Sequence, residues 1–503
     1  MTAKKNGSSR ILDLVLGAWL PSWVFLGSYV VTTVLGSTVL LTASGRARLD
    51  TFLGRPEASP ASIGSPEYYA LLYLPLLLVP LFAFLGMRLF SRSDRGPRPA
   101  LGDLRIPASQ PVLVAMALAA GGYCVLRLAW LGRLVPQALL SSTATYEQRI
   151  IERTEAIEAL GFGFYVATYA VLPTITACFL ARFILGGKRR TDGVCMLVSY
   201  VGCHYLCFAT LMKAPFVLLA LLLGATVVIA RASRLYLVIL GGVCAVALLC
   251  MQLLLGGFVL PKVPAFERVE VQSEAEPDRE ALVEEGAVAS PDTVPLASDG
   301  HATASAGASS GVDPAEPVSE EPASIVSPSR ASRRLVGRAV VSIGTSVVFR
   351  MASSFPFYVD VFSDPAERCG IETNHLPLLP RPRCVLPTKV FDEMYPGVNW
   401  VQGYAPAPAH VSAYGELGLG YALLIMALSG LALGALGKVG QVGAGPLFVV
   451  FNAVVCMFAY YLAQVPFVGA LSYSSGLIAY LLPLAALVLS STLRRRFSST
   501  RRA

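Results

Sequence analysis

Long runs of apolar residues, separated by short polar stretches, make up most of this chain. The runs are about 18 to 27 residues long, and a helix of that length crosses a hydrocarbon core of about 30 Å. We therefore expect an all-α polytopic membrane protein with about ten transmembrane helices. The expected spans are residues 19–42, 68–90, 110–132, 161–187, 193–210, 214–230, 235–258, 411–435, 446–464 and 471–493.

The composition excludes an ordinary soluble protein. Hydrophobic residues make up 54% of the chain and charged residues only 14%, whereas a soluble domain carries roughly 25% charged residues. The formal net charge of +8 is not a sign of nucleic-acid binding, because most Lys and Arg residues stand in short loops beside apolar runs. There they orient a chain in the membrane.

The distribution of basic residues predicts that both ends of the chain are cytoplasmic. The first apolar run follows Lys4, Lys5 and Arg10 and has no small-residue cleavage site, so we expect it to remain as an anchor. With the N-terminus inside, every cytoplasmic segment is basic, as the positive-inside rule requires. These segments contain Arg88 to Arg105, Lys188 to Arg190, Arg231 with Arg234, Lys438, and the tail from Arg494 to Arg502.

The segment around Lys213 decides the orientation of everything that follows it. Residues 211–215 form a turn so tight that one long broken helix is an alternative to two helices. A single helix would place the later long loop inside, against the basic C-terminal tail. We therefore expect two helices that meet at Lys213.

The long external loop, residues 259–410, separates spans 1–7 (residues 1–258) from spans 8–10 and the tail (residues 411–503). Residues 259–332 form an insert that is rich in Pro, Ala, Ser and acidic residues, and we expect it to be disordered because it has too little apolar surface to bury. Residues 333–410 regain aromatic residues and should fold against the membrane face. We expect a helix at 340–349 there, followed by Phe355, Phe357, Tyr358, Phe362, Tyr395 and Trp400.

Cys369 and Cys384 are the two cysteines that lie outside the predicted spans. An external compartment oxidises thiols, so we expect them to form a disulfide. Within a span, Cys203, His204 and Cys207 have a spacing that a metal could use. No further ligand is near them in the sequence, so packing is the favoured interpretation and no metal site is expected.

The external segment before the fourth span contains the first candidate site residues, Arg149 and Arg153. On a helix these two arginines are four positions apart and project from one face. Two guanidinium groups at the external membrane interface suit the binding of a phosphate or pyrophosphate. The alternative is that Glu152, Glu155 and Glu158 merely pair with the arginines at the surface, which contributes little energy.

Lys213 and Arg350 are expected on the same side of the membrane. Lys213 stands at the external end of the fifth span, and Arg350 follows an apolar helical stretch. Charged groups near a bilayer are kept at an interface or paired in a cavity, so both could be simple anchors. The topology nevertheless places four cations around one external site, and we assign that site to phosphate or substrate binding.

The end of the long loop contains the remaining candidates, His410, Tyr414 and Glu416, in a segment that continues with Gly418 and Gly420. The two glycines allow close approach of helices or lipid. Either His410 or Glu416 could be the general base of a transfer reaction. The alternative is that the residues form a polar start to the eighth span, where a carboxylate is tolerated without catalysis.

This layout resembles the Wzy-type oligosaccharide repeat unit polymerases, relatives of the O-antigen ligases. The similarity rests on the number of spans, the segment with Arg149 and Arg153, the basic residue Lys213 in a tight hinge, and the large late external loop. The loop's aromatic and Gly-rich exit at residues 414–420 also looks like that family's return into the membrane.

The resemblance implies glycosyl transfer between undecaprenyl pyrophosphate-linked oligosaccharides outside a bacterial cytoplasmic (inner) membrane. Arg149, Arg153, Lys213 and Arg350, with Tyr414, would hold the lipid-linked substrate, and His410 or Glu416 would lie near the acceptor hydroxyl. Such an enzyme needs no metal or other cofactor, because pyrophosphate is already a good leaving group. A chain-length regulator or a flippase would be its protein partner. Alternatives are a transporter or flippase of lipid-linked sugars, a ligase-like transferase, and a membrane anchor or sensor.

Overall fold

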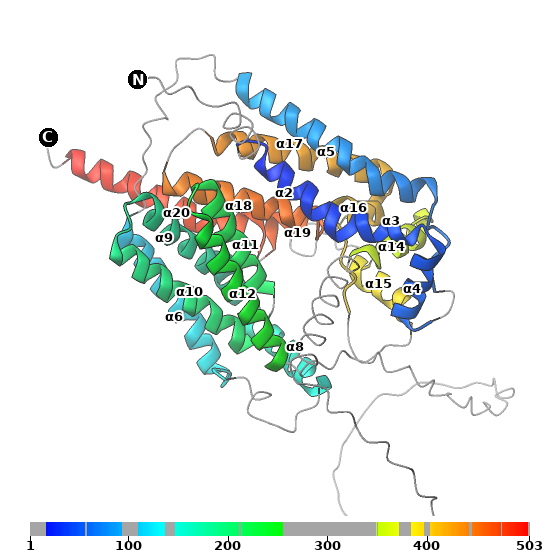
Figure 1. Ribbon diagram of the computed structural model, residues 1–503, viewed down its shortest axis with the longest axis horizontal. Helices are drawn as coiled ribbons and strands as arrows, with labels where there is room; N and C mark the ends of the chain where they lie inside the picture. Colours follow the sequence, from blue (N-terminus) through cyan, green and yellow to red (C-terminus); the bar gives the residue numbers. More distant parts are fainter. Residues whose placement is uncertain are drawn as a thin grey trace, which may run out of the picture. The chain divides into compact units, whose positions relative to one another are not determined.

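Every element of the computed structural model is a helix within the residues that it describes (Figure 1). All of these residues belong to one unit, which is made of residues 1–261 and 340–503. The predicted acidic insert, residues 259–332, and Trp400 lie outside the described residues, as does the predicted helix at 340–349 apart from Phe349. The described residues are 17–55, 58–92, 109–135, 146–210, 212, 214–254, 349, 351–371, 384–396, 403–441, 445–473 and 475–500.

Each of the ten predicted spans coincides with an apolar helix or with consecutive helices. The helices follow from the apolar runs, because a backbone in hydrocarbon must satisfy its hydrogen bonds within its own segment. They are α2, η1 and α3 (Leu20–Tyr29, Val30–Val34 and Leu35–Leu40), α5 (Pro66–Arg92), α6 (Gln110–Trp130), α8, η4 and α9 (Tyr146–Val166, Ala167–Val171 and Leu172–Leu185), α10 (Arg190–Thr210), α11 (Ala214–Ile229), α12 (Arg234–Leu254), α17 (Leu419–Val439), α18 (Pro446–Leu462), and α19 with α20 (Phe467–Ser472 and Leu477–Thr500).

Seven stretches in the described part of the chain are long and apolar enough to cross a membrane. Three further apolar helices are shorter, at Ala214–Ile229, Arg234–Val246 and Pro446–Leu462. The chain is therefore a helical, multi-pass membrane protein, and the total of ten spans stays a prediction. The seven stretches are Leu20–Leu40, Pro66–Phe90, Gln110–Trp130, Glu158–Leu185, Arg190–Thr210, Leu419–Val439 and Phe467–Leu493.

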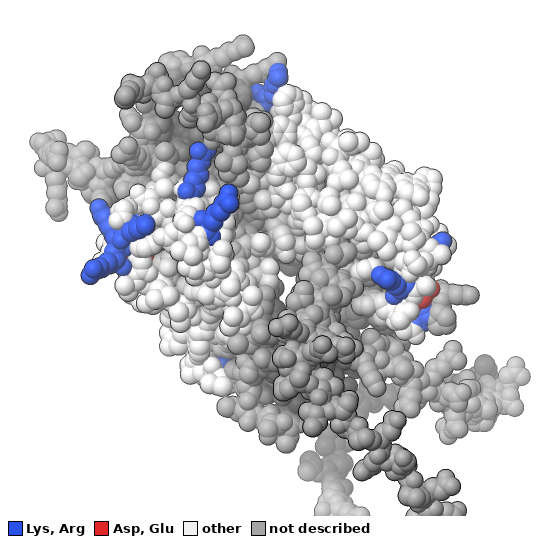
Figure 2. Space-filling model, viewed as in Figure 1, with Lys and Arg blue, Asp and Glu red and all other residues white. Residues whose placement is uncertain are grey.

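The surface of the bundle is apolar where lipid would touch it. Leu118, Leu126 and Val238 are 71%, 72% and 70% exposed, and such side chains would be unfavourable in water. Figure 2 shows blue side chains gathered where α9 meets α10 and, at the opposite end, around α4 (Ala43–Leu53). A broad uncharged surface lies between them. This separation is what a bilayer requires, because charged groups belong at its interfaces.

The chain reverses at the hinge that follows α10. Helix α10 packs along α9, and α11 packs against α9 as well. A helix that continued onward from the end of α10 could not return to α9, so the segment contains two helices and not one long broken helix. This agrees with the expectation of two helices at this place. Lys213 itself lies outside the described residues.

Helices α5 and α17 pack closely, and their backbones touch at glycines. A Cβ atom on Gly430 would lie 2.5 Å from the carbonyl oxygen of Val79, and one on Gly434 would lie 2.0 Å from that of Ala83. The spacing of these glycines is the small-xxx-small pattern that lets membrane helices approach each other. The packing of α17 therefore depends on the absence of side chains at both positions.

The eighth and tenth spans begin differently from the sequence prediction. The predicted span 411–435 is divided by Gly418, which has φ of 90° and ψ of −170°, a conformation that favours glycine. A short helix α16 (Ala409–Leu417) precedes it, and α17 follows it. The predicted span 471–493 is likewise divided between α19 and α20. The break between α19 and α20 falls on a serine-rich stretch, residues 472–476, whereas Gly418 stands in a run that is apolar apart from Glu416.

Helices α14 (Phe355–Val361), α15 (Leu386–Met394) and α16 pack together at one end of the bundle. Helix α4 is joined to the end of α15 through Arg55, and we call the four helices the cap. Phe355, Tyr358 and Phe362 are fully buried in it. Arg55, which follows α4, donates hydrogen bonds to the carbonyls of Glu393 and Met394 at the end of α15. The aromatic part of the long loop thus folds against the helix ends.

Candidate functional site

Helix α16 bears the three predicted site residues whose side chains the structure describes, His410, Tyr414 and Glu416. It begins after Pro408, which fits the start of a helix, and it ends at Gly418. The three side chains are only 2%, 3% and 4% exposed. A helix this short, with three buried polar side chains, must be held in position by contacts with neighbouring helices.

His410 joins α16 to the first two spans. Its Nε2 atom lies 3.1 Å from the carbonyl oxygen of Leu71 and 3.2 Å from the hydroxyl of Tyr29. Because the carbonyl can only accept, Nε2 carries the proton and the lone pair is on Nδ1. The Tyr29 hydroxyl is also within 3.0 Å of the carbonyls of Leu71 and Leu72, to which it can donate.

The surroundings of His410 favour a positioning role over that of a general base. Burial lowers the pKa of His410 to about 3, so its ring is neutral at physiological pH and has little affinity for a substrate proton. Its hydrogen bonds fix the start of α16 against α2 and α5. Glu416 is the better placed of the two predicted bases, because it follows at the end of α16 beside the start of α17.

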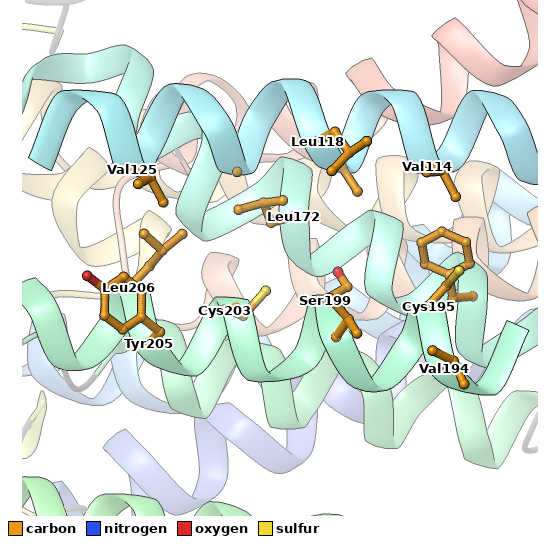
Figure 3. A pocket seen from close by; sticks show the side chains of 15 residues that line it. Val114, Leu118, Val125, Leu172, Val194, Cys195, Ser199, Cys203, Tyr205 and Leu206 are labelled. Atoms are coloured by element: carbon orange, nitrogen blue, oxygen red, sulfur yellow. The ribbon is translucent and has the colours of Figure 1, made fainter. Parts of the chain in front are cut away.

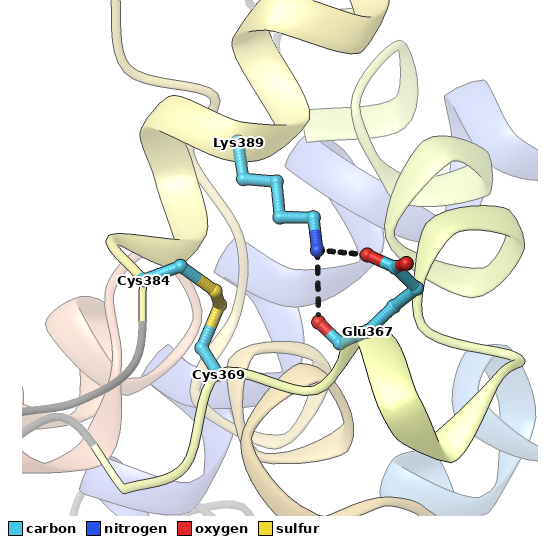
Figure 4. Close-up of a disulfide and its surroundings, with 4 residues drawn as sticks. All are labelled: Glu367, Cys369, Cys384 and Lys389. Carbon is cyan, nitrogen blue, oxygen red and sulfur yellow. Dashed lines mark hydrogen bonds and ion pairs between the residues drawn. A yellow bond between two sulfur atoms is a disulfide. The ribbon is translucent and has the colours of Figure 1, made fainter. Parts of the chain in front are cut away.

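The predicted disulfide between Cys369 and Cys384 is present and lies against α16 (Figure 4). The backbone N–H of Cys369 donates to the carbonyl of Gly415, and that of Gly370 donates to the carbonyl of Glu416, each at 3.2 Å. Beside the disulfide, Lys389 pairs with the carboxylate of Glu367 and donates to its backbone carbonyl (Figure 4). The chain near residue 369 is therefore fixed by covalent and polar contacts.

Arg368 is held by this arrangement at the junction of α16 and α17. Its Cζ atom lies 6.0 Å from the centre of the Tyr414 ring. A Cβ atom on Gly418 would be 2.7 Å from the Arg368 Cζ and Nη1 atoms, so the guanidinium lies directly on the glycine backbone. Arg368 has no carboxylate partner among the described residues, and its buried Nε atom has no hydrogen-bond partner there.

The electrostatics of this junction suit an anion. The first N–H groups of α17 have no acceptor within their own helix and carry the positive end of its dipole. A guanidinium at the same place is unfavourable by itself and becomes favourable when an anion binds between them. Burial and then the Glu67 carboxylate raise the pKa of Tyr414, which Arg368 lowers, so its hydroxyl stays protonated and can donate.

The four cations predicted from the sequence are not brought together within the described structure. The backbone of Arg149 and Arg153 belongs to α8, but their side chains lie outside the described residues. Lys213 and Arg350 lie outside them entirely. Their convergence on one external site remains a prediction.

Sequence reasoning missed Arg368. Its contacts to Tyr414 and Gly418 join residues far apart in the chain, and no spacing rule predicts them. One signal was available, because Arg368 directly precedes a cysteine whose disulfide was expected. A charged residue beside a disulfide has a fixed backbone, which is what a binding residue requires.

Reduction of the disulfide should loosen this site more than the bundle. The two cysteines are 15 residues apart, and closing a loop of that size stabilises by about 3 kcal/mol in the chain-entropy model. We expect a Cys384→Ser variant to become sensitive to proteases between residues 369 and 417 while the spans stay protected. Limited proteolysis with mass spectrometry measures this. Equal protection of the variant and the natural protein would contradict the role given to the disulfide.

No known protein family, curated protein or solved structure matches this chain.

Proposed function

We propose that the protein is a membrane glycosyltransferase that polymerises undecaprenyl pyrophosphate-linked oligosaccharide repeat units, in the manner of the Wzy-type polymerases. The observation that carries the proposal is Arg368, a fixed guanidinium at the N-terminal end of α17 that has no carboxylate partner among the residues that the structure describes. Such a group suits the pyrophosphate of a lipid-linked donor. The location would be a bacterial cytoplasmic membrane with the cap outside.

The reaction places little demand on the protein beyond charge and geometry. The acceptor hydroxyl of one lipid-linked chain attacks the anomeric carbon of another, and the bond from that carbon to the pyrophosphate oxygen breaks. The leaving undecaprenyl pyrophosphate gains negative charge, which Arg368 and the first N–H groups of α17 would stabilise. Glu416 would accept the proton of the acceptor hydroxyl, and the Tyr414 hydroxyl would orient the donor.

The cations predicted from the sequence complete the proposed site. Arg149, Arg153, Lys213 and Arg350 would contact the second phosphate or the sugar chain. Several cations are expected because a pyrophosphate carries more charge than one arginine neutralises. In this proposal, His410 fixes α16 and takes no part in proton transfer.

Purified protein reconstituted in liposomes with a lipid-linked repeat unit tests the proposal. We expect a ladder of longer lipid-linked chains, with release of undecaprenyl pyrophosphate and without a nucleotide sugar. Movement of the unit across the bilayer without a new glycosidic bond would instead indicate a flippase. Transfer only to an unrelated acceptor would indicate a ligase.

Substitutions of Arg149 and Arg350 test the cationic site. With Ala at either position we expect loss of polymer while single repeat units on the lipid carrier persist, since their synthesis and export lie upstream. With Lys we expect activity to fall more than abundance, because the charge stays but the bidentate geometry is lost. Gel analysis of lipid-linked glycans measures both. Full-length polymer from a stably expressed Arg149→Ala or Arg350→Ala protein would remove these residues from the site.

A further inference from the structure

An apolar groove runs along the bundle between α6 and α10, with α9 as its floor (Figure 3). Its volume is about 310 Å³. The side chains of Val114, Leu118 and Val125 line it from α6, and those of Val194, Val198 and Leu206 line it from α10 (Figure 3). Because both walls belong to helices that can span a membrane, the groove lies at the depth of the hydrocarbon core.

The polar groups around the groove are satisfied elsewhere. The Ser199 hydroxyl lies 2.6 Å from that of Thr176, and the Tyr205 hydroxyl donates to the carbonyl of Leu134 at 3.0 Å. The groove therefore presents an apolar surface. Leu118 and Val198 are 71% and 67% exposed, so the groove opens sideways to the lipid, and an apolar chain can enter without crossing water.

The length of the groove favours a chain longer than one leaflet. Val114 and Val125 are about 16 Å apart along α6, and Val114 is about 24 Å from the helix end at Trp130. A phospholipid tail reaches only about 15 Å, half of the hydrocarbon core. A single chain that fills the groove from the Trp130 end must pass the midplane of the bilayer.

Two cations stand near that end of α6, although neither lines the groove, and basic residues at a membrane interface attract anionic headgroups. Arg127 lies within an expected span and has no carboxylate partner in the described part of the chain. One of its nitrogens donates to the carbonyl of Ala159 at 2.9 Å, beside the break in α8 at Gly161. An unpaired cation within a span is a functional-site candidate. Arg133 lies beyond it, 3.7 Å from Glu155.

We propose that this groove binds the polyprenyl chain of a lipid carrier, with the carrier's phosphate at the membrane interface near the Trp130 end of α6. The inference rests on the proposed function and adds the place where the lipid part of the substrate is held. The groove would hold the lipid chain of the carrier beside the bundle, while the sugar end of the carrier extends toward the cap.

Two glycines make the test specific. A Cβ atom on Gly121 or Gly202, both of which line the groove, would meet no atom within 4 Å, so a leucine there fills the groove without disturbing the protein. Gly122 also has open space and does not line the groove, so Gly122→Leu is a matched control on the same helix. All three changes keep α6 or α10 helical, because leucine is a good helix former.

The experiment uses undecaprenyl phosphate that carries a photoreactive diazirine along its chain, with the full-length protein in nanodiscs of phosphatidylethanolamine and phosphatidylglycerol. We expect crosslinks on α6 and α10 that fall about tenfold in Gly202→Leu and Gly121→Leu, since overfilling a packed site weakens binding by about that factor. Gly122→Leu should label like the natural protein. A diazirine phospholipid should label the groove much less.

Three outcomes would overturn the inference: crosslinks on other helices only, labelling that Gly202→Leu does not change, or equal labelling by the phospholipid, which would make the groove an ordinary acyl-chain site. Because labelling needs no turnover, its result is independent of the polymerisation assay. Labelling of the groove without polymer formation would support the lipid site and refute the proposed function. Polymer formation without labelling would support the proposed function and refute the lipid site.

Discussion

Replacement of Arg368 by Ala is expected to reduce polymer formation by about a hundredfold or more, because removing one donor to a developing negative charge typically lowers the rate by that amount. The folded protein should persist, since the described part of the chain gives Arg368 no ion pair to lose. Gel analysis of lipid-linked glycans, normalised to protein abundance, measures the effect. The Arg368→Lys variant should be intermediate, because lysine keeps the charge but lacks the planar fork.

Arg48→Ala is the matched control for Arg368. Arg48 is an exposed cation on α4 of the same cap and does not contact the segment that holds Arg368, so its loss should leave polymer formation nearly unchanged. Gly418→Ala should resemble Arg368→Ala, since a methyl group there would displace the guanidinium. Normal polymer from a stable Arg368→Ala protein, or equal losses in Arg368→Ala and Arg48→Ala, would contradict the assignment of the anion site.

Replacement of Gly434 by Leu is expected to prevent accumulation of the folded protein. The backbone of α5 touches this glycine, so any side chain there forces α17 away from α5. Overfilling a packed interface destabilises by about 1–3 kcal/mol, and a clash with backbone should reach the upper end of that range. Such a loss is a large part of the stability of a typical protein.

Gly420→Leu provides the comparison on the same helix. Gly420 is exposed, and a Cβ atom there would meet nothing within 4 Å, so this variant should accumulate normally. Detergent-solubilised protein, followed by size-exclusion chromatography, measures both. A Gly434→Leu protein that elutes as a single symmetric peak at normal yield would show that α5 and α17 can separate without loss of the fold.

The spans could be predicted from the sequence because each is a continuous apolar run, and the environment of a membrane helix is read directly from its composition. The break at Gly418 could not, because glycines also occur within unbroken helices, as Gly430 and Gly434 do in α17, and the contacts of α16 with the rest of the cap are not visible in the sequence. The disulfide followed from the compartment expected for Cys369 and Cys384.

The candidate site was predicted only in part. His410, Tyr414 and Glu416 were found because polar residues at a membrane entry are unusual, but their different roles depend on neighbours such as Tyr29 that are distant in sequence. Arg368 depends on tertiary contact in the same way. The groove between α6 and α10 was not predictable, since residues that line a groove and residues that face lipid have the same apolar character.

Deletion of the gene, followed by analysis of the lipid-linked glycans that accumulate, tests whether the protein is a polymerase. We expect single repeat units on undecaprenyl pyrophosphate, exposed outside the membrane, and no longer polymer. The natural gene should restore polymer, and the Arg368→Ala gene should not. An unchanged distribution of polymer lengths would rule out the proposed polymerase activity, and so would repeat units that accumulate only on the cytoplasmic face, which would indicate a flippase.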